Sequence, residues 1–170
     1  TLGLIGFGSI GQTTARLARA VGFETIAHDA FLPTGHEAWT TTRQCPSIDV
    51  LLEQADVISL HCPLTPQTEG LISAAQLAAM KPGSILINTA RGGIVDESAL
   101  AEALLSGHLG GAAIDVFASE PIDEATAAVF ANVPNLILTP HVAGVTKQSN
   151  ERISAVTAEN VLRALQESRT

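Results

Sequence analysis

Three glycines near the start of the chain could bring its backbone close to a phosphate group. Gly6, Gly8 and Gly11 occur in Gly-Phe-Gly-Ser-Ile-Gly, directly after an apolar run of strand length and at the opening of a helical pattern. In such a turn the first glycine permits the tight bend, the second lets the backbone approach a pyrophosphate, and the third lets helix and strand pack closely. The amides near Ser9 and Ile10 are then free to bind phosphate, aided by the helix dipole. The sequence therefore predicts a dinucleotide site.

A carboxylate follows the second predicted strand where a dinucleotide site needs one. Asp29 stands about 20 residues beyond the glycines, where a ribose 2'-hydroxyl requires an acceptor. A 2'-phosphate would be repelled there, and no arginine occupies the adjacent positions to receive one. We therefore expect NAD as the cofactor. The alternative is a glycine turn with an unrelated exposed aspartate.

The elements that must position these residues follow from the alternation of short apolar runs with longer helical patterns. The predicted strands are 2–6, 24–29, 56–61, 84–89, 111–116 and 136–139. The predicted helices are 10–20, 48–54, 74–80, 97–105 and 146–167. In segment 31–46, where periodicity is weak, we allow only for a short edge strand. Right-handed crossovers would then give an α/β fold, a doubly wound parallel sheet of the Rossmann type.

The bulk composition favours one globular domain. Of 170 residues, 46% are hydrophobic and 15% charged, which argues against disorder. The net charge of -8 lacks the basic footprint that nucleic acid requires, and no apolar run is long enough to cross a membrane. Cys45 and Cys62 show no C-x-x-C spacing, so we expect reduced thiols and no metal site. Because reduced thiols are typical of the cytoplasm, we expect a cytoplasmic protein. Because Thr1 leads straight into a strand pattern, we expect the chain to be part of a longer protein.

Four further segments place polar and charged residues after predicted strands. They are His61-Cys-Pro-Leu-Thr-Pro-Gln-Thr-Glu-Gly-Leu-Ile72, Asn88-Thr-Ala-Arg-Gly-Gly-Ile-Val-Asp96, Gly111-Ala-Ala-Ile-Asp-Val-Phe-Ala-Ser-Glu-Pro121 and Thr139-Pro-His-Val-Ala-Gly144. With the glycine turn they resemble the D-isomer-specific 2-hydroxyacid dehydrogenase family nearly end to end. In that family the cofactor domain is inserted between two parts of a substrate domain. The resemblance implies that residues 1–170 are the NAD-binding domain and that the substrate domain is absent from this chain.

The resemblance also implies the catalytic residues. Arg91 would orient the substrate, Glu120 would be the carboxylate partner, and His141 would be the acid-base residue. The implied cofactor contacts, beyond the glycine turn and Asp29, are Cys62, Pro63, Thr68, Ala90, Arg91, Asp115, His141 and Gly144.

These residue types suit the reduction of a 2-keto acid. A guanidinium at Arg91 can hold the substrate carboxylate in a two-pronged grip and polarise the adjacent carbonyl. Hydride transfer leaves an alkoxide unless a proton arrives, which His141 can supply. A carboxylate at Glu120 would fix the ring and favour its charged form. Each residue taken alone could instead be a solvated charge or a turn residue.

The resemblance leaves several functions open. We expect an NAD-dependent enzyme acting on a small 2-hydroxy or 2-keto acid, and a homodimer because family members are generally dimers. An NAD(H)-sensing protein of the corepressor type, which shares the fold and these residues, is the rival. Phosphoglycerate dehydrogenase is a further alternative, although the run after Thr139 differs from many such enzymes. Formate dehydrogenases are disfavoured because they usually carry glutamine in place of Glu120.

Overall fold

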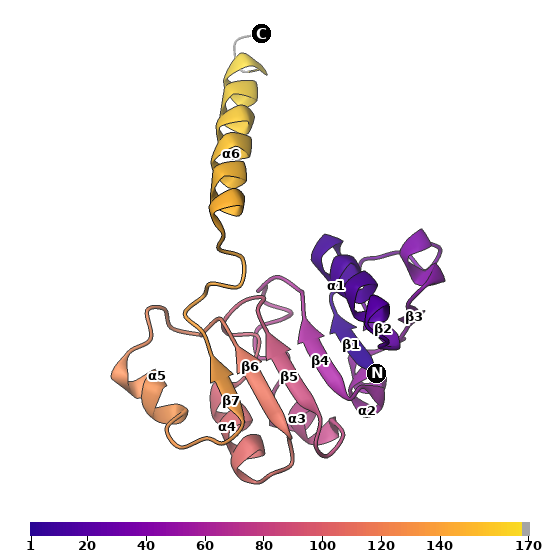
Figure 1. Cartoon of the computed structure of the whole chain (residues 1–170), viewed down its shortest axis with the longest axis vertical. Coiled ribbons are helices and arrows are strands. Elements are labelled where there is room, and N and C mark those ends of the chain that lie inside the picture. The colour runs from indigo at the N-terminus through magenta and orange to yellow at the C-terminus, as the bar shows by residue number, and fades with distance from the viewer. Residues whose placement is uncertain (168–170) are drawn as a thin grey trace. The chain divides into compact units, whose positions relative to one another are not determined.

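A seven-stranded, fully parallel sheet organises the residues from Thr1 to Pro140 (Figure 1). This computed structural model describes residues 1–167 and divides the chain into two units, Thr1–Pro140 and His141–Thr170. The strands are β1 (Leu2–Ile5), β2 (Thr25–His28), β3 (Arg43–Gln44), β4 (Val57–Leu60), β5 (Ile85–Asn88), β6 (Gly111–Ile114) and β7 (Leu136–Leu138). Their order is β3-β2-β1-β4-β5-β6-β7, so the strand order reverses between β1 and β4. This reversal is the switch point at which such sheets bind ligands.

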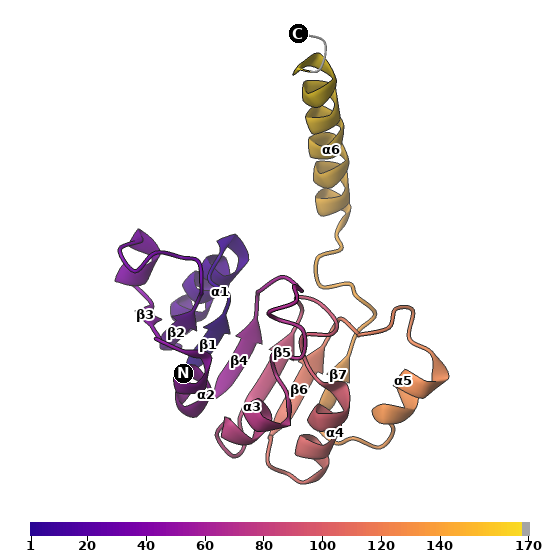
Figure 2. The same ribbon diagram turned by 180° about the vertical axis from the view of Figure 1, so that it is seen from behind.

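Helices of the first unit lie on both faces of the sheet. They are α1 (Ser9–Ala20), α2 (Ile48–Gln54), α3 (Ala74–Ala79), α4 (Glu97–Leu105) and α5 (Glu124–Val129), with one 3-10 helix, η1 (Glu37–Thr40). Helix α1 covers one face over β1 and β2, and α2, α3 and α4 lie side by side on the other (Figures 1 and 2). The predicted doubly wound fold is confirmed.

The alternation of side chains along each strand builds two cores, one on each face. Leu2, Leu4 and Ala27 point toward α1, where they pack with Phe7 and Ala15. The intervening residues enter the larger core, which includes Ile26, Ile58, Leu60, Leu86 and Ile114 from the sheet and Leu51, Leu52, Leu77, Leu100 and Leu104 from the helices. Burial of strands on both faces explains why they read as continuous apolar runs.

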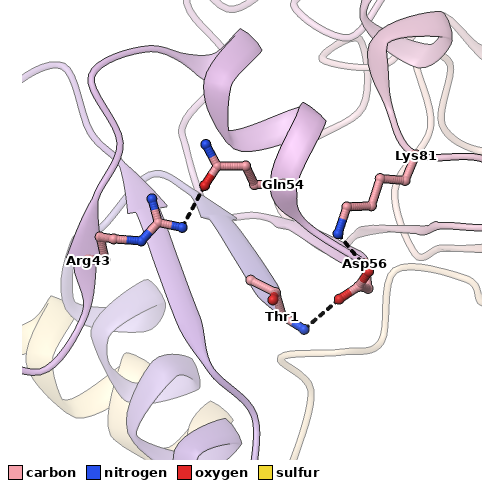
Figure 3. A network of polar contacts seen from close by, with 5 residues as sticks. All are labelled: Thr1, Arg43, Gln54, Asp56 and Lys81. Atoms are coloured by element: carbon pink, nitrogen blue, oxygen red, sulfur yellow. Dashed lines mark hydrogen bonds and ion pairs between the residues drawn. The ribbon is translucent and has the colours of Figure 1, made fainter.

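A polar cluster closes the amino-terminal edge of the sheet (Figure 3). Asp56 accepts a hydrogen bond from the Lys81 ammonium at 2.9 Å and from the amino group of Thr1 at 2.7 Å. Nearby, the Arg43 guanidinium donates to Gln54 Oε1 at 2.6 Å. The cluster precedes β4 and so lies at the edge opposite the one where the predicted site residues follow the strands.

Short elements are where the structure departs from the predictions. Helix α5 and η1 were not expected, although Asp123 caps α5 by accepting the N–H of Thr126 at 2.8 Å. The edge strand allowed for in segment 31–46 exists as the two residues of β3. Helices α2 and α4 have the predicted bounds.

The second unit consists of a connecting segment and helix α6 (Lys147–Glu167). Thr146 precedes the helix, where its N–H donates to Ser149 Oγ at 2.8 Å and its hydroxyl accepts the N–H of Ser149 at 2.9 Å. This reciprocal pair satisfies amides that the first turn leaves free. The predicted helix over 146–167 is therefore confirmed, with Thr146 as its cap.

Candidate functional site

The predicted site residues of the first unit all follow the carboxyl ends of strands. Because the sheet is parallel, those ends share one edge. The glycine turn follows β1, Asp29 follows β2, Cys62 and Pro63 follow β4, Ala90 and Arg91 follow β5, and Asp115 and Glu120 follow β6. The topology thus gathers residues that are far apart in the sequence.

The glycine turn has the geometry that a pyrophosphate cradle requires. Gly6 has φ +90°, and a Cβ there would lie 2.7 Å from the backbone nitrogen of Cys62. A Cβ on Gly11 would lie 2.5 Å from the carbonyl oxygen of Gly6, so helix α1 approaches β1 as closely as glycine permits. A Cβ on Gly8 would meet nothing within 4 Å, which leaves open space beside the backbone. The residues present therefore fit a dinucleotide pyrophosphate at this turn.

Asp29 holds the glycine turn as well as standing where the ribose is expected. Its Oδ2 accepts the N–H of Phe7 at 2.6 Å, and its Oδ1 accepts those of Phe31 and Leu32 at 2.8 and 2.9 Å. Burial opposes ionisation, but the three backbone N–H groups outweigh it, so the pKa of Asp29 lies below its ordinary value. Asp29 is therefore a preformed anion, and its Oδ2, which accepts only one of these N–H groups, has a second lone pair for a ribose hydroxyl.

The loop after β4 meets the glycine turn at the switch point. His61 and Cys62 contribute the backbone that excludes a side chain at Gly6. Burial raises the pKa of the Cys62 thiol, and the charge of Asp29 raises it further, so this cysteine is a poor nucleophile. The Thr68 hydroxyl donates to the carbonyl of Pro63 at 2.6 Å and so closes the loop on itself. Thr68, a predicted cofactor contact, thus has a shaping role that the sequence did not indicate.

Asn88 shapes the turn that presents Arg91. The Asn88 side chain is buried, donates from Nδ2 to the carbonyl of Arg91 at 3.0 Å, and accepts the N–H of Ala90 at 3.0 Å. Arg91 itself is exposed, and its guanidinium donates to the carbonyl of Ala90 at 2.6 Å. The buried amide therefore fixes the backbone from which an exposed guanidinium projects.

Backbone pairing joins the Arg91 turn to the loop after β4. The N–H of Gly70 donates to the carbonyl of Gly93 at 2.8 Å, and that of Ile72 donates to the carbonyl of Ile94 at 3.0 Å. Ile72 and Val95 form a parallel bridge. The loops that carry the predicted cofactor contacts and the predicted substrate arginine are thus hydrogen-bonded to each other.

The loop after β6 supplies two carboxylates in different surroundings. Asp115 is buried, and its Oδ1 accepts the Thr139 hydroxyl at 2.5 Å. Glu120 is exposed and accepts the N–H of Phe117 at 2.9 Å through Oε1. The Asp115 carboxylate thus has a fixed orientation, whereas the Glu120 carboxylate lies at the protein surface.

His141 and Gly144 belong to the second unit. His141 has a φ of +54°, which is uncommon for a residue with a side chain. The carbonyl of Gly144 accepts the hydroxyl of Ser149 at 2.8 Å, which ties it to the start of α6. The convergence of His141 with Arg91 and Glu120 stays a prediction, as do the catalytic and cofactor roles of all the residues named above.

Asn88 and Thr139 are the residues that the sequence analysis missed. Both lie within segments 88–96 and 139–144, and an asparagine at the end of a strand is typical of a side chain that caps a turn. The other histidines of the first unit also form hydrogen bonds: His28 with Cys45, His36 with Ala38, His61 with Ser59 and His108 with Leu77. Burial also lowers the pKa of His61.

Among residues 1–167, no group of three or more histidine, cysteine or acidic side chains is placed to hold a metal ion. Nor does any helix in that range combine the length and apolar character needed to span a membrane.

Comparisons with known proteins agree with the geometry. The family described as D-isomer specific 2-hydroxyacid dehydrogenase, NAD binding domain, matches residues 1–143. The (S)-sulfolactate dehydrogenase of Chromohalobacter salexigens is 54% identical over 165 residues, which is 97% of this chain and 53% of that protein. The glycerate dehydrogenase of Methylorubrum extorquens is 44% identical over 161 residues, 95% of this chain and 48% of that protein.

Solved structures give the same picture. D-lactate dehydrogenase with NAD+ from Lactobacillus jensenii superposes with a TM-score of 0.84 and 35% identity, covering 95% of this chain and 51% of that one. The chain therefore spans about half the length of the relatives it matches.

Proposed function

This chain belongs to the D-isomer specific 2-hydroxyacid dehydrogenase family and matches the NAD-binding domain of that family. We therefore propose that it is the cofactor-binding domain of an enzyme that interconverts a 2-hydroxy acid and its 2-keto acid. The observation that carries the proposal is the Arg91 turn. A buried amide fixes it, and it follows β5, one strand beyond the switch point where the glycine turn lies. The substrate domain, in this proposal, lies outside residues 1–170.

Arg91 binds and orients the substrate in this mechanism. Its guanidinium leaves the Ala90 carbonyl and forms a two-pronged contact with the substrate carboxylate, with a further N–H directed at the 2-keto oxygen. This grip holds the carbonyl carbon in place and stabilises the negative charge that develops on its oxygen. Lysine offers a single charged point in place of the planar fork.

His141 moves the proton. In the reductive direction it donates a proton to the substrate oxygen as hydride reaches the carbonyl carbon, and in the oxidative direction it accepts the hydroxyl proton. Glu120 orients the ring by accepting one of its N–H groups. Bound NAD(H) supplies or accepts the hydride. Asp115, held in orientation by the Thr139 hydroxyl that donates to its Oδ1, would orient the nicotinamide amide by accepting one of its N–H groups.

The experiment uses the intact protein that contains this chain. NADH oxidation is followed with a panel of 2-keto acids drawn from the relatives: 3-sulfopyruvate, hydroxypyruvate, its 3-phosphate and pyruvate. Rapid turnover of one of them supports the proposal, and the preferred acid separates the phosphoglycerate enzymes from the others. Nucleotide-dependent peptide binding with only marginal turnover of every acid would favour a sensor of the corepressor type instead.

His141→Ala tests the acid-base role in that assay. Turnover should fall by about 100-fold or more, the usual contribution of general acid catalysis. NADH binding, measured by fluorescence, should be preserved. Unchanged turnover would rule out the assigned role of His141.

We further propose that the intact protein is a cytoplasmic homodimer. Exposed apolar side chains on the first unit support an interface, among them Ile10 and Leu17 of α1, Val21 directly after α1, and Ile137 of β7. The free thiols of Cys45 and Cys62 support a reducing compartment. Analytical ultracentrifugation gives the oligomeric state, and cell fractionation gives the location.

A further inference from the structure

The turn that carries Arg91 and the loop that carries Glu120 touch through their backbones. A Cβ on Gly92 would lie 1.7 Å from the carbonyl oxygen of Phe117 and 2.7 Å from the nitrogen of Ala118. Only a glycine can occupy that position, because any side chain would force the two segments apart. The residue next to the proposed substrate arginine is therefore in direct contact with the segment that leads to Glu120.

A carboxylate on helix α4 also binds this segment. Glu97 Oε1 accepts the N–H of Ala118 at 2.8 Å, while the preceding N–H, that of Phe117, is bound by Glu120 itself at 2.9 Å. Two neighbouring amides are thus held by two acidic side chains. Charge-assisted bonds of this kind are stronger than those between neutral groups.

Helix α4 is a rigid base for Glu97. Asp96 caps the helix by accepting the N–H of Ala99 at 3.0 Å, and Leu100 and Leu104 are buried in the larger core. The N–H of Asp96 also donates to the carbonyl of Ile72 at 3.0 Å. The Glu97 carboxylate is therefore mounted on the segment that continues directly from the Arg91 turn.

From these contacts we propose that Glu97 is a positioning residue for the reaction, which rests on the function proposed above. Its carboxylate clamps the Ala118 amide and so sets the distance between the proposed substrate arginine and the proposed carboxylate partner of the acid-base histidine. The clamp acts on the geometry of the reacting groups. It leaves the glycine turn and Asp29, where the dinucleotide binds, unaffected.

A set of three variants in the intact enzyme tests the clamp. Glu97→Ala removes the acceptor, and kcat should fall by about tenfold or more because small displacements of reacting groups carry large rate penalties. The dissociation constant for NADH should stay within about twofold, since the clamp lies away from the pyrophosphate turn. Glu97→Gln keeps an oxygen that can accept the same N–H and should recover most of the lost kcat. Glu102→Ala, on the same helix and exposed, is the matched control and should behave as wild type.

Rescue by glutamine separates the clamp from a helix-dipole role. Glu97 is also the first residue of α4, where a negative charge stabilises the helix. A dipole role needs the charge, so glutamine would fail as alanine does, and that result would overturn the proposal. An unchanged kcat in Glu97→Ala would overturn it as well.

Hydrogen exchange at the Ala118 amide makes a second readout. Exchange should quicken in Glu97→Ala and stay slow in Glu97→Gln and Glu102→Ala. A wild-type enzyme without turnover of any 2-keto acid would refute the proposed function, and the positioning role with it. Normal wild-type turnover with slow Ala118 exchange in Glu97→Ala would refute the clamp alone.

Discussion

Asp29 accepts the backbone N–H of Phe7 at 2.6 Å, and this one hydrogen bond links the end of β2 to the middle of the glycine turn. The same carboxylate binds the N–H groups of Phe31 and Leu32. The residue expected to recognise the ribose is therefore also a structural part of the pyrophosphate cradle. Nucleotide selectivity and loop geometry depend on the same side chain.

Asp29→Ala should weaken both nucleotide binding and the fold. The affinity for NADH should fall at least about tenfold, and the preference for NADH over NADPH should shrink, because the anion that repels a 2'-phosphate is gone. The free energy of unfolding should drop by about 2 kcal/mol, since three backbone donors lose a charged acceptor. Fluorescence titration and urea unfolding measure the two effects. Glu53→Ala, an exposed change on α2, is the control; a selectivity equal to wild type in Asp29→Ala would contradict the ribose assignment.

Alanine at Gly8 and at Gly11 should separate binding from stability. Gly8 has φ -73° and open space around its Cβ position, so Gly8→Ala should fold normally but place a methyl group where the pyrophosphate must approach. Gly11→Ala should instead destabilise the fold by about 2 kcal/mol or more, because its Cβ would meet the Gly6 carbonyl oxygen. Thermal unfolding and NADH titration of both variants check this. Equal effects of the two substitutions on stability would show that the turn is less tightly packed than described.

Thr139→Val should destabilise the first unit while preserving its shape. The substitution replaces the hydroxyl that donates to the buried Asp115 with a methyl group of similar volume. Loss of a hydrogen bond to a buried carboxylate should lower the free energy of unfolding by about 1.5–3 kcal/mol. Thr139→Ser keeps the hydroxyl and should recover most of that loss in urea unfolding. A valine variant as stable as wild type would show that the pair contributes little to folding.

The carboxyl group of Asp56 should have an unusually low pKa. Hydrogen bonds from the Thr1 amino group and from Lys81 lower the pKa of Asp56 to about 2. Because folding lowers the pKa of this carboxyl, ionised Asp56 stabilises the fold at pH values above the ordinary carboxyl pKa, near 3.8. This stabilisation is lost as the pH falls toward 2. In a chain that begins at Thr1, NMR titration of the carboxyl carbon should give a midpoint near 2, and Lys81→Met should raise it. Because the group is exposed, high salt should also raise the midpoint, and a midpoint insensitive to both changes would contradict the ion pair.

Long and strongly patterned elements were predictable from the sequence. Helices α2 and α4 have the bounds that their apolar periodicity indicated, and six strands were found to within two residues at each end. Helix α5 and η1 were missed because no apolar period marks them, whereas α3, which also has six residues, was predicted. Helix α5 depends on a local cap at Asp123 more than on an apolar face.

The sequence predicted which residues belong to the candidate site but not the hydrogen bonds that connect them. The motifs named the residues, and the parallel topology confirmed that those of the first unit reach one edge of the sheet. Hydrogen bonds between residues far apart in the sequence leave no local sequence pattern that would predict them. Examples are Asp29 with Phe7, separated by 22 positions, and Glu97 with Ala118, separated by 21. Such contacts depend on how strands pair, which no short motif encodes.

The close approach of Gly6 to the backbone of His61 and Cys62 bears on how this domain could be re-engineered. The first and second halves of the sheet meet there with no side chain between them, so neither half can be exchanged for that of another dehydrogenase without matching the contour of the other. A graft that places any side chain at Gly6 would force the two halves apart. Successful grafts should transfer the turn and the loop after β4 together, as one module.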